Sequence, residues 1–281
     1  MVDNDTGDDV RLLDATRVMG RFSTEVTQAV DAALGTEDAT NTDMRFACEL
    51  HRSRVVTVER YMELSRLDRR RTARRSKLFE SLGLITRVPD PRDGRSSVFK
   101  ASRVGLVRLQ RLETYVGEYF AHCTPLAKEL IDLLDVASDS PRARTSPTEP
   151  RPTAIDVLDR MAAVGNRLSA AIVAKRPDAI YTGREHTALI AVLNQGDVRA
   201  GALAEQLGLT SGGLTYLVKQ LEAKGMVERT FGRLDSDRRA VSIELTPYGR
   251  AVALDTLSAV DDLSEDLVCV FREIHDFDST P

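Results

Sequence analysis

The sequence has no tryptophan, an aromatic content of only 5%, and three widely separated cysteines, Cys48, Cys123 and Cys269. Cysteines at such separations form neither a disulfide framework nor a set of zinc ligands. The four histidines are also scattered, and no residue pattern indicates a catalytic nucleophile or a phosphate-binding loop. We therefore expect no metal, no cofactor and no enzyme activity.

No apolar run approaches the roughly 18–20 residues that a membrane-spanning helix needs. Residues 1–9 are polar and acidic, whereas a secretory signal begins with basic residues followed by an apolar stretch. We expect a disordered acidic tail over 1–9 and a soluble, cytoplasmic protein.

Positive charge does not dominate the chain but is concentrated in one segment. The whole sequence carries 39 basic and 43 acidic residues, a net charge of -4. Residues 66–103 contain twelve basic residues against four acidic ones. Phosphate binding depends on the distribution of charge more than on its sum, so this segment predicts a surface for double-stranded DNA.

The segment 137–153 lacks helical periodicity and holds four of the ten prolines. This composition is typical of an extended linker, although a surface loop within one domain is the alternative. The 281 residues suit two domains. We predict one domain over 10–136 and a second over 154–275.

An internal repeat supports two related domains. Shifting the sequence by 142 residues, and by 144 beyond one turn, places identical residues on one another. The pairs are Glu63 and Glu205, Leu67 and Leu209, Lys77 and Lys219, Glu80 and Glu222, Gly83 and Gly225, Arg87 and Arg229, Asp93 and Asp237, Arg95 and Arg239, and Gly105 and Gly249. The change of shift is what a different loop length in two homologous hairpins would produce.

Each half predicts the same elements in the same order: a long amphipathic helix, a second helix, a helix-turn-helix, a β-hairpin wing and a closing helix. In the first half the predicted helices are 10–34, 42–51 and 68–82, the wing strands are 84–88 and 96–101, the closing helix begins near 102, and one more helix runs from Thr124-Pro125 to about 136. In the second half the predicted helices are 154–176 and 183–195, and the helix-turn-helix opens with a short helix and turn over 200–210. The wing strands of the second half are 226–230 and 240–245, and its closing helix begins at Thr246-Pro247. The fold class is mainly α with small β-hairpin wings (α+β).

The helix-turn-helix signal is clearest in the second half. Its second helix is predicted between an N-cap at Thr210 and a stop at Gly225. Its apolar residues lie three or four positions apart and predict one buried side. They are Leu214, Leu217, Val218 and Leu221.

The second helix of a helix-turn-helix enters the major groove, where side chains read base edges. In the first half this helix carries six basic residues, Arg69, Arg70, Arg71, Arg74, Arg75 and Lys77. Arginine suits the task because its planar fork can bind a guanine edge or a phosphate. Leu78 and Phe79 with Ala73 are the expected buried side. A solvated charged surface is the alternative, but almost no acid balances these arginines.

The corresponding helix of the second half is nearly neutral. Its predicted DNA-contacting residues are Ser211, Gly212, Gly213, Thr215, Tyr216, Lys219 and Gln220. The serine and the glycines at its start would let the backbone approach a phosphate closely. Thr215 and Gln220 could contact base edges or the sugar-phosphate, whereas Tyr216 could do so or cover the domain core.

Both wing tips share an Asp-x-Arg pattern. An arginine at the end of a hairpin is well placed to enter the minor groove, and the aspartate could orient it. The predicted wing contacts are Arg92, Asp93, Arg95, Arg233, Asp237, Arg238 and Arg239. A generic polar turn is the alternative, which the repetition of the pattern makes weaker.

These motifs resemble the MarR family of bacterial regulators. The resemblance is carried by TGREHTALI (182–190), LAEQLGLTSGGLT (203–215), LEAKGMVER (221–229), DRR (237–239) and LTPYG (245–249). It covers nearly all of 154–275. The first half is a more divergent copy, and its segment 61–67 lacks the usual turn glycine, which affects the expected angle between the two helices.

MarR proteins are homodimers held by their first and last helices, and they bind pseudo-palindromic operators. The resemblance therefore implies that this chain carries both protomers, a single-chain pseudodimer with a helical dimerisation-type domain. It implies a transcriptional regulator, which we expect to be a repressor, on a pseudo-palindromic or asymmetric operator.

Many MarR proteins release DNA when a small ligand binds a crevice beside the winged domain. The residues considered for such a crevice are His186, with a surface position near a helix start as the alternative, and Cys48, which fits better as a core residue. The family's oxidant sensors use a cysteine near the start of the first helix, and neither half has one there.

Two other functions remain open. One or both winged domains could be protein-docking modules, as the small basic surplus over 208–250 allows. The chain could also be a nucleoid-type protein that binds DNA without sequence preference.

Overall fold

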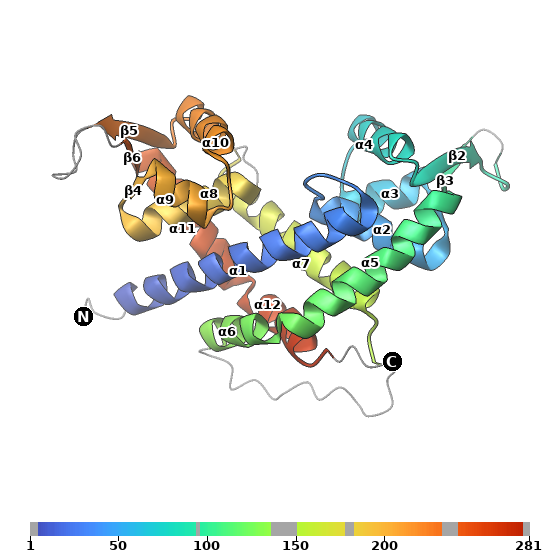
Figure 1. Ribbon diagram of the computed structural model, residues 1–281, viewed down its shortest axis with the longest axis horizontal. Coiled ribbons are helices and arrows are strands. Elements are labelled where there is room, and N and C mark those ends of the chain that lie inside the picture. The colour runs from blue at the N-terminus through green and yellow to red at the C-terminus, as the bar shows by residue number, and fades with distance from the viewer. Residues whose placement is uncertain (1–4, 94–95, 136–150, 178–182, 232–240, 278–281) are drawn as a thin grey trace. The chain divides into compact units, whose positions relative to one another are not determined.

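The computed structural model describes residues 5–93, 96–135, 151–177, 183–231 and 241–277 (Figure 1). The chain forms two compact units, and each is discontinuous in sequence. The first-wing unit contains residues 21–166 and 266–281, and the second-wing unit contains residues 1–20 and 167–265. Both units are mainly helical with one small antiparallel sheet, which confirms the predicted fold class.

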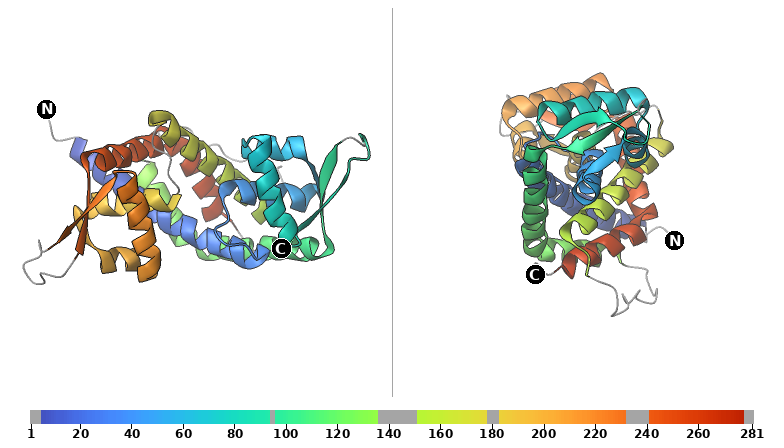
Figure 2. Two further views of the ribbon diagram at one scale, coloured as in Figure 1. Left: turned by 90° about the horizontal axis from the view of Figure 1, so that it is seen from above. Right: turned by 90° about the vertical axis from the view of Figure 1, so that its right-hand side faces the viewer.

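The first-wing unit contains a complete helix-turn-helix and wing. Its elements are the end of α1 (Asp5–Leu34), α2 (Asn41–Ser53), β1 (Val55–Thr57), α3 (Val58–Ser65), α4 (Arg69–Ser81), β2 (Ile85–Pro89), β3 (Ser97–Ala101), α5 (Arg103–His122), α6 (Thr124–Leu134), the start of α7 (Ala154–Lys175) and most of α12 (Ser264–His275). The hairpin of β2 and β3 projects beyond α4 (Figure 1, Figure 2).

Short polar residues determine where the helices of this unit begin. The side chain of Asp68 accepts the backbone N–H of Arg71 at the start of α4. Ser102 accepts the N–H of Gly105 in the same way at the start of α5. Each cap satisfies a backbone donor that has no partner within the helix.

The sheet of the first-wing unit has the order β1-β3-β2. Val56 lies opposite Phe99 in the first pair of strands, and Arg87 lies opposite the same Phe99 in the second. The sequence predicts the β2–β3 hairpin but not β1, because a strand of three residues is too short to show an alternating pattern.

Stacked aromatic rings hold the helix-turn-helix to this sheet. Phe46 stacks on Tyr61 with ring centroids 3.9 Å apart and meets Phe79 and Phe99 edge-on at 5.1 and 5.9 Å. All four side chains are buried. Such aromatic pairs contribute about 0.5–1.5 kcal/mol each beyond the burial of their area. The core of the unit therefore connects α2, α3, α4 and β3 directly.

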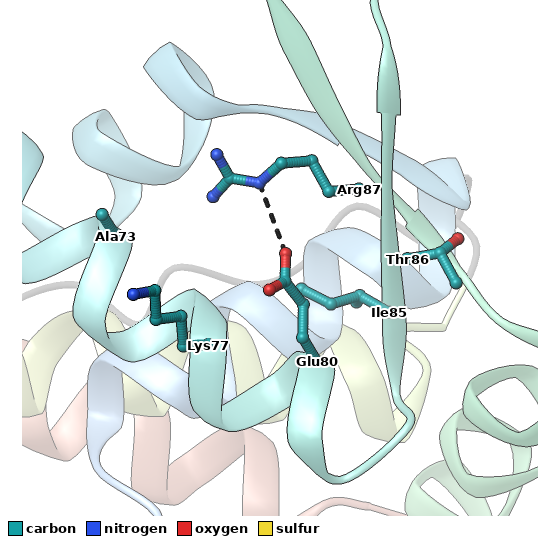
Figure 3. Close-up of a pocket in the computed structure, with 6 residues that line it drawn as sticks. All are labelled: Ala73, Lys77, Glu80, Ile85, Thr86 and Arg87. Atoms are coloured by element: carbon teal, nitrogen blue, oxygen red, sulfur yellow. Dashed lines mark hydrogen bonds and ion pairs between the residues drawn. The ribbon is translucent and has the colours of Figure 1, made fainter.

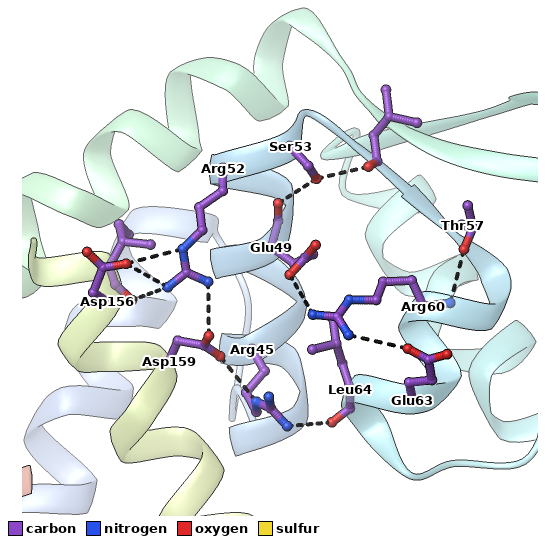
Figure 4. Close-up of polar contacts among 12 residues, drawn as sticks. Arg45, Glu49, Arg52, Ser53, Thr57, Arg60, Glu63, Leu64, Asp156 and Asp159 are labelled. Carbon is purple, nitrogen blue, oxygen red and sulfur yellow. Dashed lines mark hydrogen bonds and ion pairs between the residues drawn. The ribbon is translucent and has the colours of Figure 1, made fainter.

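Residues from beyond the proline-rich segment complete the first-wing unit. Arg52 on α2 donates to Asp156 at 2.9 Å and to Asp159 at 2.9 Å, both on the first turns of α7, and Arg45 donates to Asp159 at 3.1 Å (Figure 4). Phe22 on α1 meets Phe271 on α12 edge-on, with centroids 5.0 Å apart. Helices from both halves of the sequence thus share one core.

The second-wing unit repeats this arrangement. Its elements are the start of α1, the end of α7, α8 (Gly183–Gln195), β4 (Asp197–Arg199), α9 (Ala200–Gln206), α10 (Ser211–Ala223), β5 (Val227–Phe231), β6 (Val241–Leu245) and α11 (Pro247–Asp262). Its sheet has the order β4-β6-β5, the counterpart of β1-β3-β2. Thr210 and Thr246 are N-caps, and Gly225 has φ +69°, so the predicted caps and stop are confirmed.

Glycines mark two reciprocal close approaches between the halves of the sequence. In the first-wing unit, a Cβ at Gly165 of α7 would lie 2.4 Å from Asn41 Nδ2, at the start of α2. In the second-wing unit, a Cβ at Gly20 of α1 would lie 3.1 Å from Thr187 Cγ2 on α8. The long first helix of each half therefore packs against the second helix of the other half.

Three predicted boundaries differ from the structure. Helix α1 begins at Asp5, so part of the segment predicted as a disordered tail over 1–9 is helical. The closing helix of the second half is divided into α11 and α12 around Leu263. Helix α6 begins at Thr124 itself, with Cys123 in the N-cap position and no hydrogen bond from a capping side chain. The predicted linker 137–153 lies outside the described residues except for 151–153.

Candidate nucleic-acid interface

The outer face of α4 is strongly basic. Five of its predicted DNA-contacting side chains are exposed, namely Arg69, Arg70, Arg71, Arg74 and Lys77. The opposite face is small and polar: Thr72 and Ser76 are fully buried beside Phe79. Ser76 Oγ donates to the carbonyl of Ala73 at 3.1 Å, which allows a hydroxyl to lie in the core. The predicted buried side is correct for Phe79, whereas Ala73 and Leu78 are only partly buried.

Arg75 differs from its basic neighbours because its guanidinium contacts a buried acid. Its Nε donates to Asp43 Oδ1 at 2.6 Å, and its Nη2 contacts Oδ2 of the same carboxylate. Asp43 is 0% exposed and also accepts the N–H and the hydroxyl of Thr40. The hydrogen bonds that Arg75 donates to Asp43 raise the pKa of Arg75. Arg75 therefore anchors α4 to α2, since a buried carboxylate requires a charged partner, and its contact with DNA stays a prediction.

The second-wing unit has a corresponding anchor. Glu185 lies 142 residues after Asp43, is 4% exposed, and accepts a hydrogen bond from Lys224 Nζ at 2.6 Å. Lys224 is the C-cap residue of α10, whereas Arg75 lies in the middle of α4. The second helix of each helix-turn-helix, α4 or α10, which we call the recognition helix, thus forms an ion pair with a buried acid on α2 or α8. The basic residue of the pair lies at a different point along each recognition helix.

The outer face of α10 is exposed and carries little charge. Ser211, Gly212, Thr215, Tyr216 and Lys219 are exposed, and Gly213 and Gln220 are partly exposed. Tyr216 is 68% exposed, so the alternative in which its ring covers the core is wrong. A Cβ at Gly212 would meet nothing within 4 Å, which leaves the backbone at the start of α10 open to approach. The predicted buried stripe of α10 is confirmed.

Only part of the wing prediction can be placed. Arg92 and Asp93 are exposed at the tip of the first hairpin. The tip is closed by hydrogen bonds from Ser96 N to the carbonyl of Asp93 at 2.9 Å and from Arg92 N to Asp90 Oδ1 at 2.8 Å. Five predicted wing residues lie outside the described residues: Arg95, Arg233, Asp237, Arg238 and Arg239. Their contacts remain predictions.

An open groove of about 620 Å³ lies between α4 and β2 (Figure 3). It is lined by Ala73, Lys77, Glu80, Ile85, Thr86 and Arg87. Arg87 Nε donates to Glu80 Oε1 at 3.3 Å, and Arg87 Nη2 donates to Ser76 Oγ at 3.3 Å. Sequence reasoning used Glu80 and Arg87 only as markers of the repeat and missed them as site residues. Their repetition as Glu222 and Arg229 was the available signal.

Of the two residues considered for an effector crevice, Cys48 belongs to the interior and His186 is partly buried. Cys48 is fully buried, and burial raises the pKa of its thiol, which matches a core residue. Burial lowers the pKa of His186 to about 3, so its ring is neutral at ordinary pH. His186 is therefore neither fully exposed nor a core residue. A ligand contact for either residue remains a prediction.

The described residues offer neither a cluster of metal ligands nor a helix suited to crossing a membrane. No group of three or more His, Cys, Asp or Glu side chains there could hold a metal ion. No helix within the described ranges is long and apolar enough to cross a membrane.

Comparisons with known proteins point to one family for the second half. Residues 181–240 match the MarR family. Over 101 residues the chain is 37% identical to the HTH-type transcriptional regulator SarZ of Staphylococcus aureus, a region that is 36% of this chain and 61% of the relative. The chain thus spans less than two thirds of the length of the curated relatives that it matches.

Solved structures show a lower similarity to this chain. A mutant MarR from E. coli complexed with operator DNA has 23% identity, with 38% of this chain and 74% of that chain covered and a TM-score of 0.33. RV1404 from Mycobacterium tuberculosis has 19% identity, coverage of 40% and 77%, and a TM-score of 0.33. The family match over 181–240 includes α8, β4, α9, α10 and β5, the elements that build the second helix-turn-helix and begin its wing.

Proposed function

We propose that this chain is a DNA-binding transcriptional regulator that acts as a single-chain pseudodimer. The observation that carries the proposal is the duplicated helix-turn-helix and wing, each with a recognition helix anchored to a buried acid. The MarR match over 181–240 and the similarity to a named transcriptional regulator support it.

The composition of each unit supports the pseudodimer. The first turns of α7 pack on α2 through Arg45 and Arg52, and α12 packs on α1 through Phe271. Reciprocally, Arg11 of α1 lies 3.8 Å from Asp261 of α11 in the second-wing unit. An exchange of first and last helices is what an intertwined dimer requires, and here one polypeptide supplies both sets.

The two recognition helices divide the work unequally. On α4, five exposed cations offer attraction to phosphates and to guanine edges. On α10, the exposed Thr215 and Tyr216 present groups that contact base edges or sugar-phosphate. Because fusion frees the half-sites from identity, the operator is asymmetric, with half-sites about one helical turn apart. The regulator acts as a repressor by occupying this site.

Selection of bound DNA from a random pool tests the proposal with the full chain. It returns the site, its symmetry and the spacing of the half-sites together. A defined site of two unlike halves is the expected result, whereas two identical halves would contradict the asymmetry. Binding without any enriched sequence would instead support the nucleoid-type alternative.

A salt titration tests whether α4 and α10 contribute unequally to phosphate binding. Arg70 and Arg74 are both exposed on α4, and each lost phosphate contact lowers the dependence of log K on log salt by about one. Replacing both by alanine should therefore flatten the slope by about two, and Lys219→Ala by no more than about one. Equal slopes for the two variants would contradict the proposal.

Docking of another protein is the second candidate for the second-wing unit. The observation that favours it is the nearly neutral face of α10 with the exposed ring of Tyr216. A footprint in which the chain protects one half of the operator and leaves the other half unprotected would support docking. A small-molecule effector remains a prediction without a described site.

A further inference from the structure

Each recognition helix carries a single acidic residue, and both occupy the same position in the repeat. Glu80 is the only acid in α4, and Glu222 is the only acid in α10. Each lies against an arginine of the first wing strand: Glu80 Oε1 is 3.3 Å from Arg87 Nε, and Glu222 Oε2 is 3.2 Å from Arg229 Nη2. The chain therefore holds two copies of one acid–arginine pair.

An acid on a DNA-facing surface opposes binding, because it repels phosphates. Its contribution to stability is also small: both members of the first pair are partly exposed, and such pairs contribute at most about 1 kcal/mol. Neither electrostatic attraction to DNA nor stability accounts for an acid at this position in both halves. The contacts of the arginine give a reason.

Arg87 is held on three sides. Glu80 accepts its Nε–H, Ser76 Oγ accepts from its Nη2, and its guanidinium carbon lies 5.1 Å from the ring centre of Phe99. An arginine has five N–H donors, and these two hydrogen bonds use two of them. The side chain is 43% exposed, so its remaining edge is accessible from solvent. Figure 3 shows the guanidinium extending from β2 across the groove toward α4.

The groove lies where a DNA strand must cross. When α4 occupies the major groove and the wing the adjacent minor groove, the strand that separates the two passes between helix and wing. The groove lined by Lys77, Thr86 and Arg87 lies between those elements. An ammonium, a hydroxyl and a planar guanidinium are groups that bind phosphate oxygens.

We propose that this groove binds one phosphate of the DNA backbone, and that Glu80 is a positioning residue that orients Arg87 toward it. In the second-wing unit Glu222, which lies 3.2 Å from Arg229 Nη2, orients that arginine. The proposal rests on the proposed function, since it requires bound DNA. It assigns to an acidic residue a role in promoting binding to a polyanion.

The direction in which Glu80→Ala changes the affinity for DNA tests this proposal. If charge alone mattered, Glu80→Ala would tighten binding, because a repulsive acid is removed. A positioning role gives the opposite result: three- to tenfold weaker binding and a salt slope lower by about one, as for Arg87→Ala. Glu80→Gln should restore binding, since its amide oxygen still accepts the Nε–H. Arg87→Lys should not, since a lysine lacks the fork.

The measurement is fluorescence anisotropy of the full chain with a labelled duplex across salt concentrations, beside thermal melting of every variant. The double variant Glu80→Ala with Arg87→Ala should bind no more weakly than Arg87→Ala alone. Glu59→Ala, which removes an exposed acid from α3 of the same helix-turn-helix, is the charge control and should not weaken binding. If Glu80→Ala melts early, Glu222→Ala provides the same comparison in the second-wing unit.

The proposed phosphate site would be contradicted if Glu80→Ala bound DNA more tightly. It would also be contradicted if Glu80→Ala melted like the unaltered chain and kept the same dependence of log K on log salt. Failure of the unaltered chain to bind any duplex at low salt would overturn the proposed function instead. The two failures are therefore distinguishable.

Discussion

The carboxylate of Asp43 and the guanidinium of Arg75 form a two-point ion pair that fastens the recognition helix α4 to α2. Asp43 is fully buried, and Arg75 retains 29% of its side-chain exposure. Removing one partner of a buried pair leaves the other charge without compensation in the interior, which typically costs about 3–5 kcal/mol.

We predict that Asp43→Ala lowers the free energy of unfolding by about 3 kcal/mol. Arg74→Ala, which removes the exposed neighbour of Arg75, should change it by less than about 0.5 kcal/mol. Urea unfolding followed by circular dichroism measures both. Equal effects of the two variants would show that the pair does not anchor the helix.

Gly105 and Gly249 should tolerate no side chain. A Cβ at Gly105 would lie 1.9 Å from the carbonyl oxygen of Leu84, and one at Gly249 would lie 1.8 Å from that of Met226. Alanine at either position must displace backbone where the wing meets the closing helix, so we expect losses of about 1–3 kcal/mol. Gly201→Ala is the control, because a Cβ there meets nothing within 4 Å. Thermal melting of the three variants checks the contrast.

Tyr216 should affect DNA binding without affecting stability. Its side chain is 68% exposed on the outer face of α10, and surface substitutions usually change stability by less than about 0.5 kcal/mol. Tyr216→Ala should therefore melt like the unaltered protein but lose affinity for the selected operator more than for random DNA. Tyr216→Phe distinguishes contact by the ring from contact by the hydroxyl. A parallel loss on both DNAs would assign Tyr216 to the phosphate backbone.

His186 should make the protein less stable in mild acid. Burial lowers its pKa to about 3, whereas an unfolded histidine titrates near 6.5. Between these values the unfolded chain binds a proton that the folded chain does not. The free energy of unfolding therefore falls as the pH drops below about 6.5, by up to about 1.4 kcal/mol per pH unit from this residue.

Urea midpoints between pH 7 and pH 4 measure this dependence. His186→Leu should reduce it, and His122→Gln, at an exposed position on α5, is the matched control for the loss of a histidine. A pH profile of His186→Leu identical to that of the unaltered chain would contradict the assignment.

Sequence periodicity identified the elements whose buried side is apolar. All four residues of the predicted stripe on α10 are buried, including Leu214 and Leu221. On α4 the buried side is Thr72, Ser76 and Phe79, and two small hydroxyl residues carry no apolar signal. The inward face predicted from the apolar residues was therefore correct for Phe79 and omitted Thr72 and Ser76.

The inward role of Arg75 was also hidden in the sequence. Five neighbouring cations on α4 face outward, and nothing in the spacing distinguishes the sixth. The distinguishing residue is Asp43, an acid on the apolar side of α2, 32 positions earlier in the chain. A contact of that kind depends on how α2 and α4 pack, and local pattern does not encode the packing of two helices.

The discontinuous units have a consequence for synthesis. The first-wing unit includes most of α12, which is synthesised after the whole second helix-turn-helix and wing, and the second-wing unit includes the start of α1, which is synthesised before the first helix-turn-helix. A nascent chain that has emerged only as far as residue 166 still lacks Phe271 and Arg272, which contact Phe22 and Asp135. Because domains usually fold as they emerge, this order of synthesis delays completion of the first-wing unit until α12 has emerged. The winged domain that is synthesised first is thus completed only after the second one has been synthesised.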